Sequence, residues 1–158
     1  MAITGDQLRD SVGSFPSGVT VVTTRVRGED LGLTVSSFAS LSLDPAMVLV
    51  CIDNRSQSIP HLTPGNPIGV SVLSKEQLDI AIQFGRHGVD RFAGVPIRRG
   101  QCNLALIDAA AAWFTGRVRH AHDGGDHRVI TVVVEECGRD LEKAPLLYHR
   151  GRLNELYR

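Results

Sequence analysis

The feature that most limits the fold of this chain is a series of short apolar runs separated by tight turns. Runs rich in Val, Ile and Thr cover residues 19–26, 33–38, 47–52 and 68–73, and Arg27-Gly28-Glu29-Asp30 separates the first two. β-Branched residues favour strands, and a short turn between two strands makes an antiparallel hairpin. A parallel sheet needs a helix after most strands, and this chain has too few helical segments to supply them.

The second half of the chain continues this pattern. We expect strands at residues 112–120 and 129–135, joined by the turn Asp123-Gly124-Gly125-Asp126, and a short strand at 146–149. The segment 86–111 is of mixed character. The sequence therefore predicts an all-β fold with a few helices, in which an antiparallel sheet closes into a small barrel.

Two short amphipathic helices are expected outside this barrel. A capping-box pattern that begins at Thr4 precedes apolar residues at helical spacing, which predicts a helix over residues 5–14. A second such pattern begins at Ser74 and predicts a helix that ends near Gly85.

Length, charge and cysteine content restrict the class of protein. A chain of 158 residues is long enough for one domain with its own core, so we expect a single domain over residues 1–158. The 17 basic and 17 acidic residues cancel, which argues against binding to nucleic acid or to an anionic membrane. No apolar run approaches the roughly 20 residues that span a bilayer, and no secretion signal is visible. With three scattered cysteines, a reducing cytoplasm is the expected compartment.

Hydroxyl side chains are concentrated between aliphatic residues in segment 32–42. Backbone N–H groups and hydroxyls can bind the polar edge of a flat ligand while aliphatic side chains pack on its apolar edge. The same alternation fits a half-buried strand with its hydroxyls in solvent, and the sequence leaves both interpretations open. The hydroxyl residues are Thr34, Ser36, Ser37, Ser40 and Ser42.

A second polar group, Asn54-Arg55-Ser56-Gln57-Ser58, directly follows the apolar run 47–52. Arg55 can make charge-assisted hydrogen bonds to a phosphate, and the serine hydroxyls add further donors. A solvated turn has a similar composition. The position directly after a buried strand favours a binding site.

Three other features could take part in binding. His127, in the turn Gly125-Asp126-His127, can donate a hydrogen bond to a carboxamide or phosphate, although a plain β-turn also uses Gly and Asp. Arg91 could meet the adenylate or phosphates of a dinucleotide, or it is simply a surface charge. His120 and His122 are spaced for a metal, but no third ligand is near, so no metal is expected.

The sequence contains no GxGxxG, no GxxxxGK[ST] and no GxSxG, so a nicotinamide dinucleotide, if used, would not be held on a Rossmann helix.

Five sequence blocks are found in a specific order and spacing, at residues 15–24, 32–38, 42–45, 125–127 and 145–148. Together they resemble the short-chain flavin reductases, the small components of two-component flavin-dependent monooxygenases. The similarity runs from Leu8 to Leu156.

The resemblance implies a split β-barrel with a Greek-key core, the FMN-binding barrel of flavin reductases, assembled as a homodimer. It also implies a groove near the subunit interface for FMN or FAD. By motif position, Pro16 and Ser17 would border the pocket, Thr34, Val35, Ser36 and Ser37 would line the flavin ring, and Ser40 and Leu41 would lie close by. Cys51, Ile52, Asp53, Asn54, Arg55, Ser56 and Gln57 would face the ribityl chain and phosphate, and His127 would contact the nicotinamide nucleotide with Tyr148 nearby.

The implied activity is hydride transfer from NADH or NADPH to the flavin. This step needs orientation of two cofactors rather than a proton-abstracting group, so no catalytic side chain is expected. Reduced flavin would then diffuse to a partner monooxygenase. Two other classes remain open: a flavin- or haem-binding electron carrier with the same barrel, and a dimeric interaction domain without a ligand.

Overall fold

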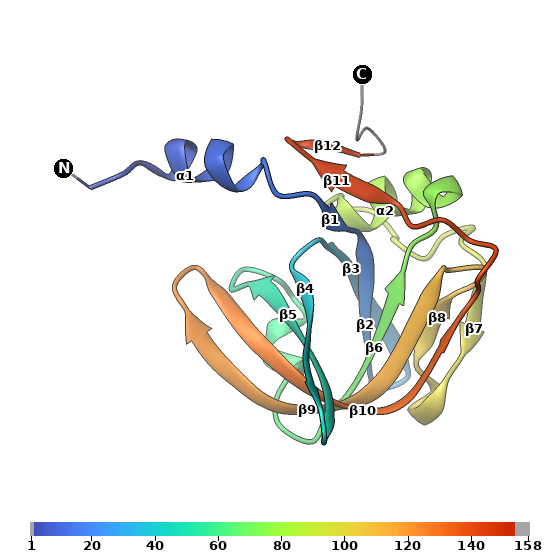
Figure 1. The fold of residues 1–158 in the computed structure, drawn as a ribbon. Helices are drawn as coiled ribbons and strands as arrows, with labels where there is room; N and C mark the ends of the chain where they lie inside the picture. The colour runs from blue at the N-terminus through green and yellow to red at the C-terminus, as the bar shows by residue number, and fades with distance from the viewer. Residues whose placement is uncertain (1, 154–158) are drawn as a thin grey trace.

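Seven strands form one antiparallel sheet in the computed structural model, which describes residues 2–153 (Figure 1). Met1 and residues 154–158 lie outside the described residues. The two ends of the expected domain and the end of the family similarity at Leu156 therefore lie outside them as well. The strand order is β3-β2-β6-β9-β10-β5-β4. These strands are β2 (Thr20–Val26), β3 (Glu29–Val35), β4 (Phe38–Leu43), β5 (Ala46–Asp53), β6 (Pro67–Val72), β9 (Ala112–Gly124) and β10 (His127–Arg139).

Shorter elements cover the upper end and one side of this sheet. β1 (Ser17–Gly18), β11 (Leu147–His149) and β12 (Arg152–Leu153) form a small sheet near the chain ends. The segment 86–111, which the sequence left undecided, contains a hairpin of β7 (Ile97–Arg99) and β8 (Ala105–Ile107). The helices are α1 (Gly5–Val12) and α2 (Leu78–Gly85), with 3₁₀ turns η1 (Ile59–His61), η2 (Lys75–Gln77) and η3 (Gln101–Asn103).

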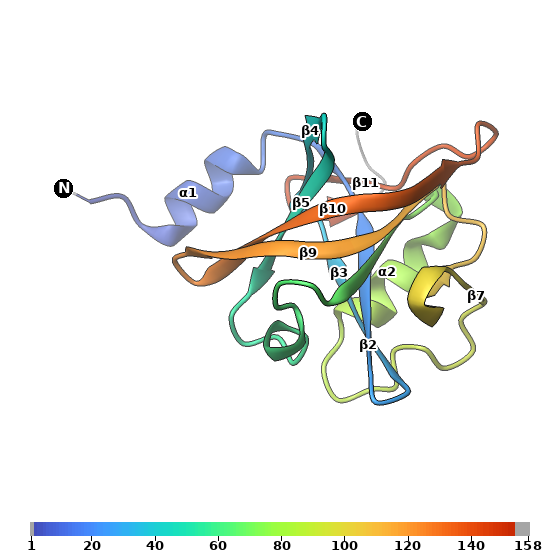
Figure 2. The same ribbon diagram turned by 90° about the horizontal axis from the view of Figure 1, so that it is seen from below.

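The sheet closes into a split barrel because one segment of chain changes its partner strand. β3 pairs with β2 as far as Val35, and β4 pairs with β5 from Phe38 onward. Only Ser36 and Ser37 separate β3 from β4, so the two edge strands of the sheet are joined end to end (Figures 1 and 2). β6 returns to lie beside β2, which completes a Greek key. The predicted barrel is confirmed, but the predicted single strand over residues 33–38 was wrong.

Alternate residues of the strands fill the barrel. In β5, Val48, Val50 and Ile52 are buried, and the residues between them are more exposed. Ile130 and Val132 on β10 join the same core cluster. Full burial of one such side chain contributes about 1.5–3 kcal/mol, so this cluster supplies much of the stability that keeps the barrel closed.

Helix α2 covers the outside of β2 and β3 and forms a second core. Ala81 and Phe84 of the helix are buried against Val21 of β2 and Leu146. A Cβ on Gly32 of β3 would lie 2.8 Å from Cε1 of Phe84, so only glycine allows the helix to approach this closely. The helix end is thereby held against β3, and both elements line the site described below.

Helix α1 extends away from the barrel (Figure 2). The predicted capping box is present, since the Gln7 N–H donates to Thr4 Oγ1 at 3.2 Å and the Thr4 N–H donates to Gln7 Oε1 at 2.9 Å. None of its residues is buried in this single chain. Leu8 and Val12 of the helix and Phe15, which follows its end, are 51%, 58% and 77% exposed.

The two main hairpins are tighter or longer than predicted. The first turn uses only Arg27 and Gly28, both at positive φ (50° and 86°), which matches the twist of two-residue hairpins. β9 and β10 extend beyond the predicted strands 112–120 and 129–135, and Gly125 and Asp126 form the turn between them. The second predicted helix is confirmed, but it begins as the 3₁₀ turn η2 before continuing as α2.

Candidate functional site

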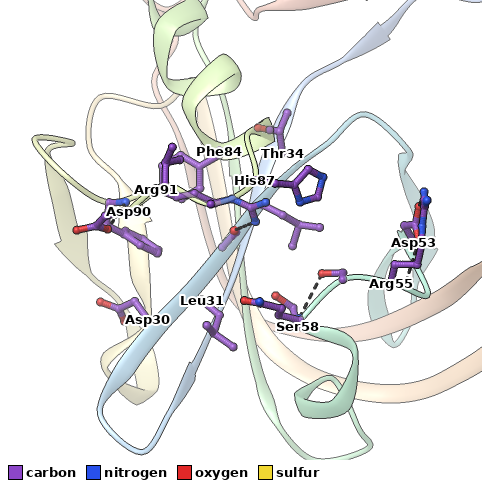
Figure 3. Close-up of a pocket in the computed structure, with 18 residues that line it drawn as sticks. Asp30, Leu31, Thr34, Asp53, Arg55, Ser58, Phe84, His87, Asp90 and Arg91 are labelled. Carbon is purple, nitrogen blue, oxygen red and sulfur yellow. Dashed lines mark hydrogen bonds and ion pairs between the residues drawn. The ribbon is translucent and has the colours of Figure 1, made fainter.

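Two cavities lie on either side of the point where β3 becomes β4. We call them the junction cavity and the α2 cavity, with volumes of about 770 Å³ and about 640 Å³. The junction cavity is lined by residues that include Phe15, Ser17, Ser36, Ser37, Phe38, Leu49, Cys51 and Tyr148. The α2 cavity is lined by residues that include Thr34, Asp53, Arg55, Ser58, Phe84, His87 and Arg91 (Figure 3).

The junction cavity combines main-chain donors with an apolar wall. Ser36 and Ser37 lie between β3 and β4. Their backbone N–H groups donate to neither β2 nor β5, and the described part of the chain provides no other acceptor for them. The Cys51 N–H donates to Ser37 O at 3.0 Å, and Ser37 Oγ donates to Cys51 O at 2.9 Å, which fixes the backbone here. Phe38 and Leu49 provide apolar surface beside these donors.

This arrangement fits a flavin ring. The carbonyl edge of the ring needs hydrogen-bond donors, and two adjacent free N–H groups supply them. Its dimethylbenzene edge needs apolar contacts, which the aromatic and aliphatic side chains of the cavity supply. Ser17 and Tyr148, which are partners across the β1–β11 pair, also line this cavity.

Thr34 lies in the α2 cavity, where its hydroxyl has a structural bond. Thr34 Oγ1 donates to the carbonyl of Ala81 in α2 at 2.6 Å. Because the proton is used in this bond, the hydroxyl can only accept a hydrogen bond from a ligand. Thr34 therefore connects β3 to the helix as well as lining the cavity.

Asp53 and Arg55 form an ion pair at the end of β5, in which Arg55 binds both carboxylate oxygens of Asp53. The Arg55 Nη2 lies 2.7 Å from Asp53 Oδ2, and both Nε and the backbone N–H of Arg55 donate to Oδ1 at 3.0 Å and 2.8 Å. The side-chain and backbone hydrogen bonds from Arg55 hold the pKa of the Asp53 carboxyl well below its usual range. The same contact raises the pKa of Arg55, whose side chain is 90% exposed. A bound phosphate would have to share this guanidinium with Asp53.

His127 lies beside this ion pair, at the start of β10. It pairs across the sheet with Asp53, and its Nδ1 lies 2.6 Å from Asp126 Oδ1. Asn54 holds the turn in place, since its backbone N–H donates to Asp126 O and its amide donates to Gly125 O, both at 3.0 Å. The structure therefore brings the second polar group and the Gly-Asp-His turn together, although they are about 70 residues apart in the sequence.

The structure divides the residues that the sequence placed in one pocket. Ser17, Ser36, Ser37, Cys51 and Tyr148 line the junction cavity, whereas Thr34, Asp53, Arg55, Ser56, Gln57 and Arg91 line the α2 cavity. The side chains of Val35 and Ile52 belong to the barrel core, so these residues can offer only main-chain atoms to a ligand. Pro16, Ser40, Leu41, Asn54 and His127 line neither cavity.

Some lining residues were not predicted. Leu49 faces the junction cavity because it alternates with the core residues Val48 and Val50, a pattern visible in the sequence. His87 lines the α2 cavity, but it lies in a loop with no periodic signal. Within residues 2–153, no group of three potential metal ligands is found. The rings of His120 and His122 are 5.2 Å apart, without a third partner.

No helix in the described part of the chain is long and apolar enough to cross a membrane.

Comparison with known proteins agrees with this fold. Residues 12–157 match the model of the flavin reductase like domain. The chain is 39% identical to the reductase component of a flavin-dependent trigonelline monooxygenase from Acinetobacter baylyi, over 92% of this chain and 47% of that protein. It is 34% identical to HsaB, a flavin-dependent monooxygenase reductase subunit from Mycobacterium tuberculosis, over 90% of this chain and 78% of that protein.

A solved structure gives the same result. The NADH:FAD oxidoreductase SgcE6 of Streptomyces globisporus, in complex with NAD and FAD fragments, superposes with a TM-score of 0.90 at 32% identity, over 99% of this chain and 97% of that one. The chain spans about half the length of the first curated relatives that it matches, 47% in one case and 40% in another. The family match nevertheless covers nearly the whole chain, and the chain belongs to the flavin reductase like domain family.

Proposed function

We propose that this protein is an NAD(P)H-dependent flavin reductase that supplies reduced flavin to a partner monooxygenase. The observation that carries the proposal is the pair of free N–H groups at Ser36 and Ser37, in a cavity with an apolar wall and in a chain of this family. Relatives described as monooxygenase reductase components support the partner class.

The chemistry is hydride transfer between two bound nucleotides, and the protein positions them. The N–H groups of Ser36 and Ser37 would donate to the polar edge of a bound flavin, and such fixed donors stabilise developing negative charge without reorganisation. Tyr148 and Ser17 line the same cavity, in which a nicotinamide ring would stack on the flavin. The step requires no proton transfer to a side chain, so we assign no catalytic residue.

His127 would hold the nicotinamide nucleotide. The Asp126 carboxylate accepts a hydrogen bond from Nδ1 of His127, which leaves Nε2 for a carboxamide or phosphate of the nucleotide. His127 lies opposite Asp53, which lines the α2 cavity, so His127 is close to that cavity although it does not line it.

We further infer that the protein is a single-domain homodimer in the cytoplasm. Leu8 and Val12 of α1 and Phe15 just after the helix are exposed apolar side chains in the described single chain, and a second copy would bury them. Cys51, Cys102 and Cys137 are all free thiols, which suits a reducing compartment.

The decisive experiment is NADH and NADPH oxidation with and without added FMN, FAD and riboflavin. Flavin-dependent oxidation supports the proposal. Protein that binds flavin but leaves both nicotinamide nucleotides unoxidised is an electron carrier instead. Protein that binds no flavin at all refutes the site as well.

A further inference from the structure

Asn54 connects the end of β5 to the turn between β9 and β10. Its side-chain Nδ2 donates to Gly125 O, and its backbone N–H donates to Asp126 O, both at 3.0 Å. The ladder between β5 and β10 ends at the pair Asp53–His127, so these two bonds carry the contact one residue beyond the sheet. The turn itself is exposed to solvent, so bonds of this kind matter for its position.

The orientation of His127 depends on this turn. Its Nδ1 lies 2.6 Å from Asp126 Oδ1, and this contact leaves Nε2 for a ligand. The Asp126 side chain is 91% exposed, so packing does not hold its carboxylate in place. Asp53, the carboxylate on the facing strand, is occupied by its ion pair with Arg55. The His127 ring therefore follows the position of the turn, which Asn54 ties to β5.

Asn54 is not placed to contact a ligand in either cavity. It lines neither the junction cavity nor the α2 cavity, although its neighbours Asp53 and Arg55 line the second of these. Its backbone N–H and its side-chain amide both donate to carbonyls of the turn. The sequence placed Asn54 beside the ribityl chain and phosphate of a flavin, whereas its contacts in the structure serve the turn that carries His127.

We propose that Asn54 is a positioning residue, which orients His127 toward the nicotinamide nucleotide by fixing the turn at Gly125 and Asp126, and that it does not contact the flavin. The inference rests on the proposed function, in which His127 holds this nucleotide. It adds a residue that sets nucleotide affinity without touching the nucleotide. Because the turn supplies no group to the hydride transfer itself, its loosening should act on KM rather than on kcat.

The test is a double-mutant cycle between Asn54→Ala and His127→Ala in the whole chain, measured as the KM for NADH and NADPH, kcat and the Kd for flavin. Loss of the bond from Asn54 to Gly125 O should raise KM roughly two- to tenfold, with kcat and the Kd for flavin unchanged. In the His127→Ala background, Asn54→Ala should cause no further change, because it acts through His127. An unchanged KM in Asn54→Ala, additive effects of the two substitutions, or a raised Kd for flavin in Asn54→Ala each overturns the proposal.

The matched control is Asn66→Ala. Asn66 is also exposed, and its amide donates to His61 O at 2.9 Å and to Thr63 Oγ1 at 3.1 Å, away from the junction cavity and the α2 cavity. Because two bonds are lost, Asn66→Ala should lower stability in thermal unfolding at least as much as Asn54→Ala does, but its KM should equal that of the wild type. A raised KM in this control would attribute the effect to general loosening of the fold and overturn the proposal.

A measurement without turnover separates the positioning of His127 from the reductase activity. With Asp126 at Nδ1, neutral His127 should carry its proton on Nδ1, and the ¹⁵N chemical shifts of the imidazole report this tautomer. Asn54→Ala should lower the fraction of this tautomer, and Asn66→Ala should not. An unchanged tautomer in Asn54→Ala overturns the proposal even where NADH is oxidised. A changed tautomer in a protein that oxidises neither nicotinamide nucleotide supports the positioning by Asn54 and refutes the proposed activity instead.

Discussion

Replacing Thr34 by Val should separate a structural hydrogen bond from a ligand contact. Thr34 Oγ1 donates to Ala81 O at 2.6 Å in a partly buried place, and this bond ties β3 to helix α2. Val fills the space of Thr but leaves the Ala81 carbonyl without this donor. A hydrogen bond of this kind contributes about 0.5–1.5 kcal/mol net, so we expect Thr34→Val to lose about 1 kcal/mol of unfolding free energy and roughly 2–4 °C in Tm.

The matched control is Ser36→Ala. Ser36 is exposed, and no hydrogen bond of its hydroxyl is found in residues 2–153. Its loss should change stability by less than about 0.5 kcal/mol. Thermal and urea unfolding of the ligand-free protein measure both variants against the wild type.

Flavin titration then tests the binding part of the argument. The Thr34 hydroxyl can accept one ligand bond and the Ser36 hydroxyl can make another, so the double variant should bind flavin roughly 5- to 30-fold more weakly, as the loss of two neutral hydrogen bonds implies. If Thr34→Val had wild-type stability, the hydrogen bond from Thr34 to Ala81 O would not stabilise the contact between β3 and α2. A double variant with unaltered flavin titration would refute a role for both hydroxyls in flavin binding.

Three further predictions follow from other parts of the structure. His127→Ala should raise the KM for NADH in steady-state assays without changing flavin affinity, and an unchanged KM for both NADH and NADPH would remove that role. The pKa of Asp30 is lowered because hydrogen bonds from two arginines outweigh its burial, so the stability that Asp30 contributes is present above about pH 4 and is lost as pH falls through the folded pKa. The loss of unfolding free energy in Asp30→Asn should therefore be largest near neutral pH and smaller in acid. A loss that does not depend on pH would contradict the pairing of Asp30 with the two arginines. Leu8→Glu with Val12→Glu should convert a dimer to a monomer in sedimentation experiments, and a dimer that persists would show that α1 is not the contact.

Local patterns predicted the strands and helices well. The runs 19–26, 47–52 and 68–73 became β2, β5 and β6 with ends shifted by at most one residue, because alternation and β-branching act within a single strand. The capping box at Thr4 was confirmed for the same reason, since its two bonds span only three residues.

The break at Ser36 and Ser37 could not be predicted in this way. It depends on which strands lie on either side, β2 before the break and β5 after it, and no local pattern encodes a change of partner. The division of the expected pocket into two cavities has the same origin. Thr34 is still held against α2, whereas Ser36 has already turned toward β5 and the end of α1.

The hydroxyl-rich segment is therefore only an indirect sign of the site. Two of its five hydroxyls make internal hydrogen bonds: Thr34 donates to Ala81 O, and Ser37 donates to Cys51 O. On the facing strand β2, Thr20 Oγ1 donates in the same way to Val35 O at 2.7 Å. These bonds hold the backbone on both sides of the two-residue gap, where the change of partner leaves adjacent N–H groups unused. The change of partner that closes the barrel also leaves free the two N–H groups that we propose as flavin donors, so a substitution that restored strand pairing at this point should abolish flavin binding.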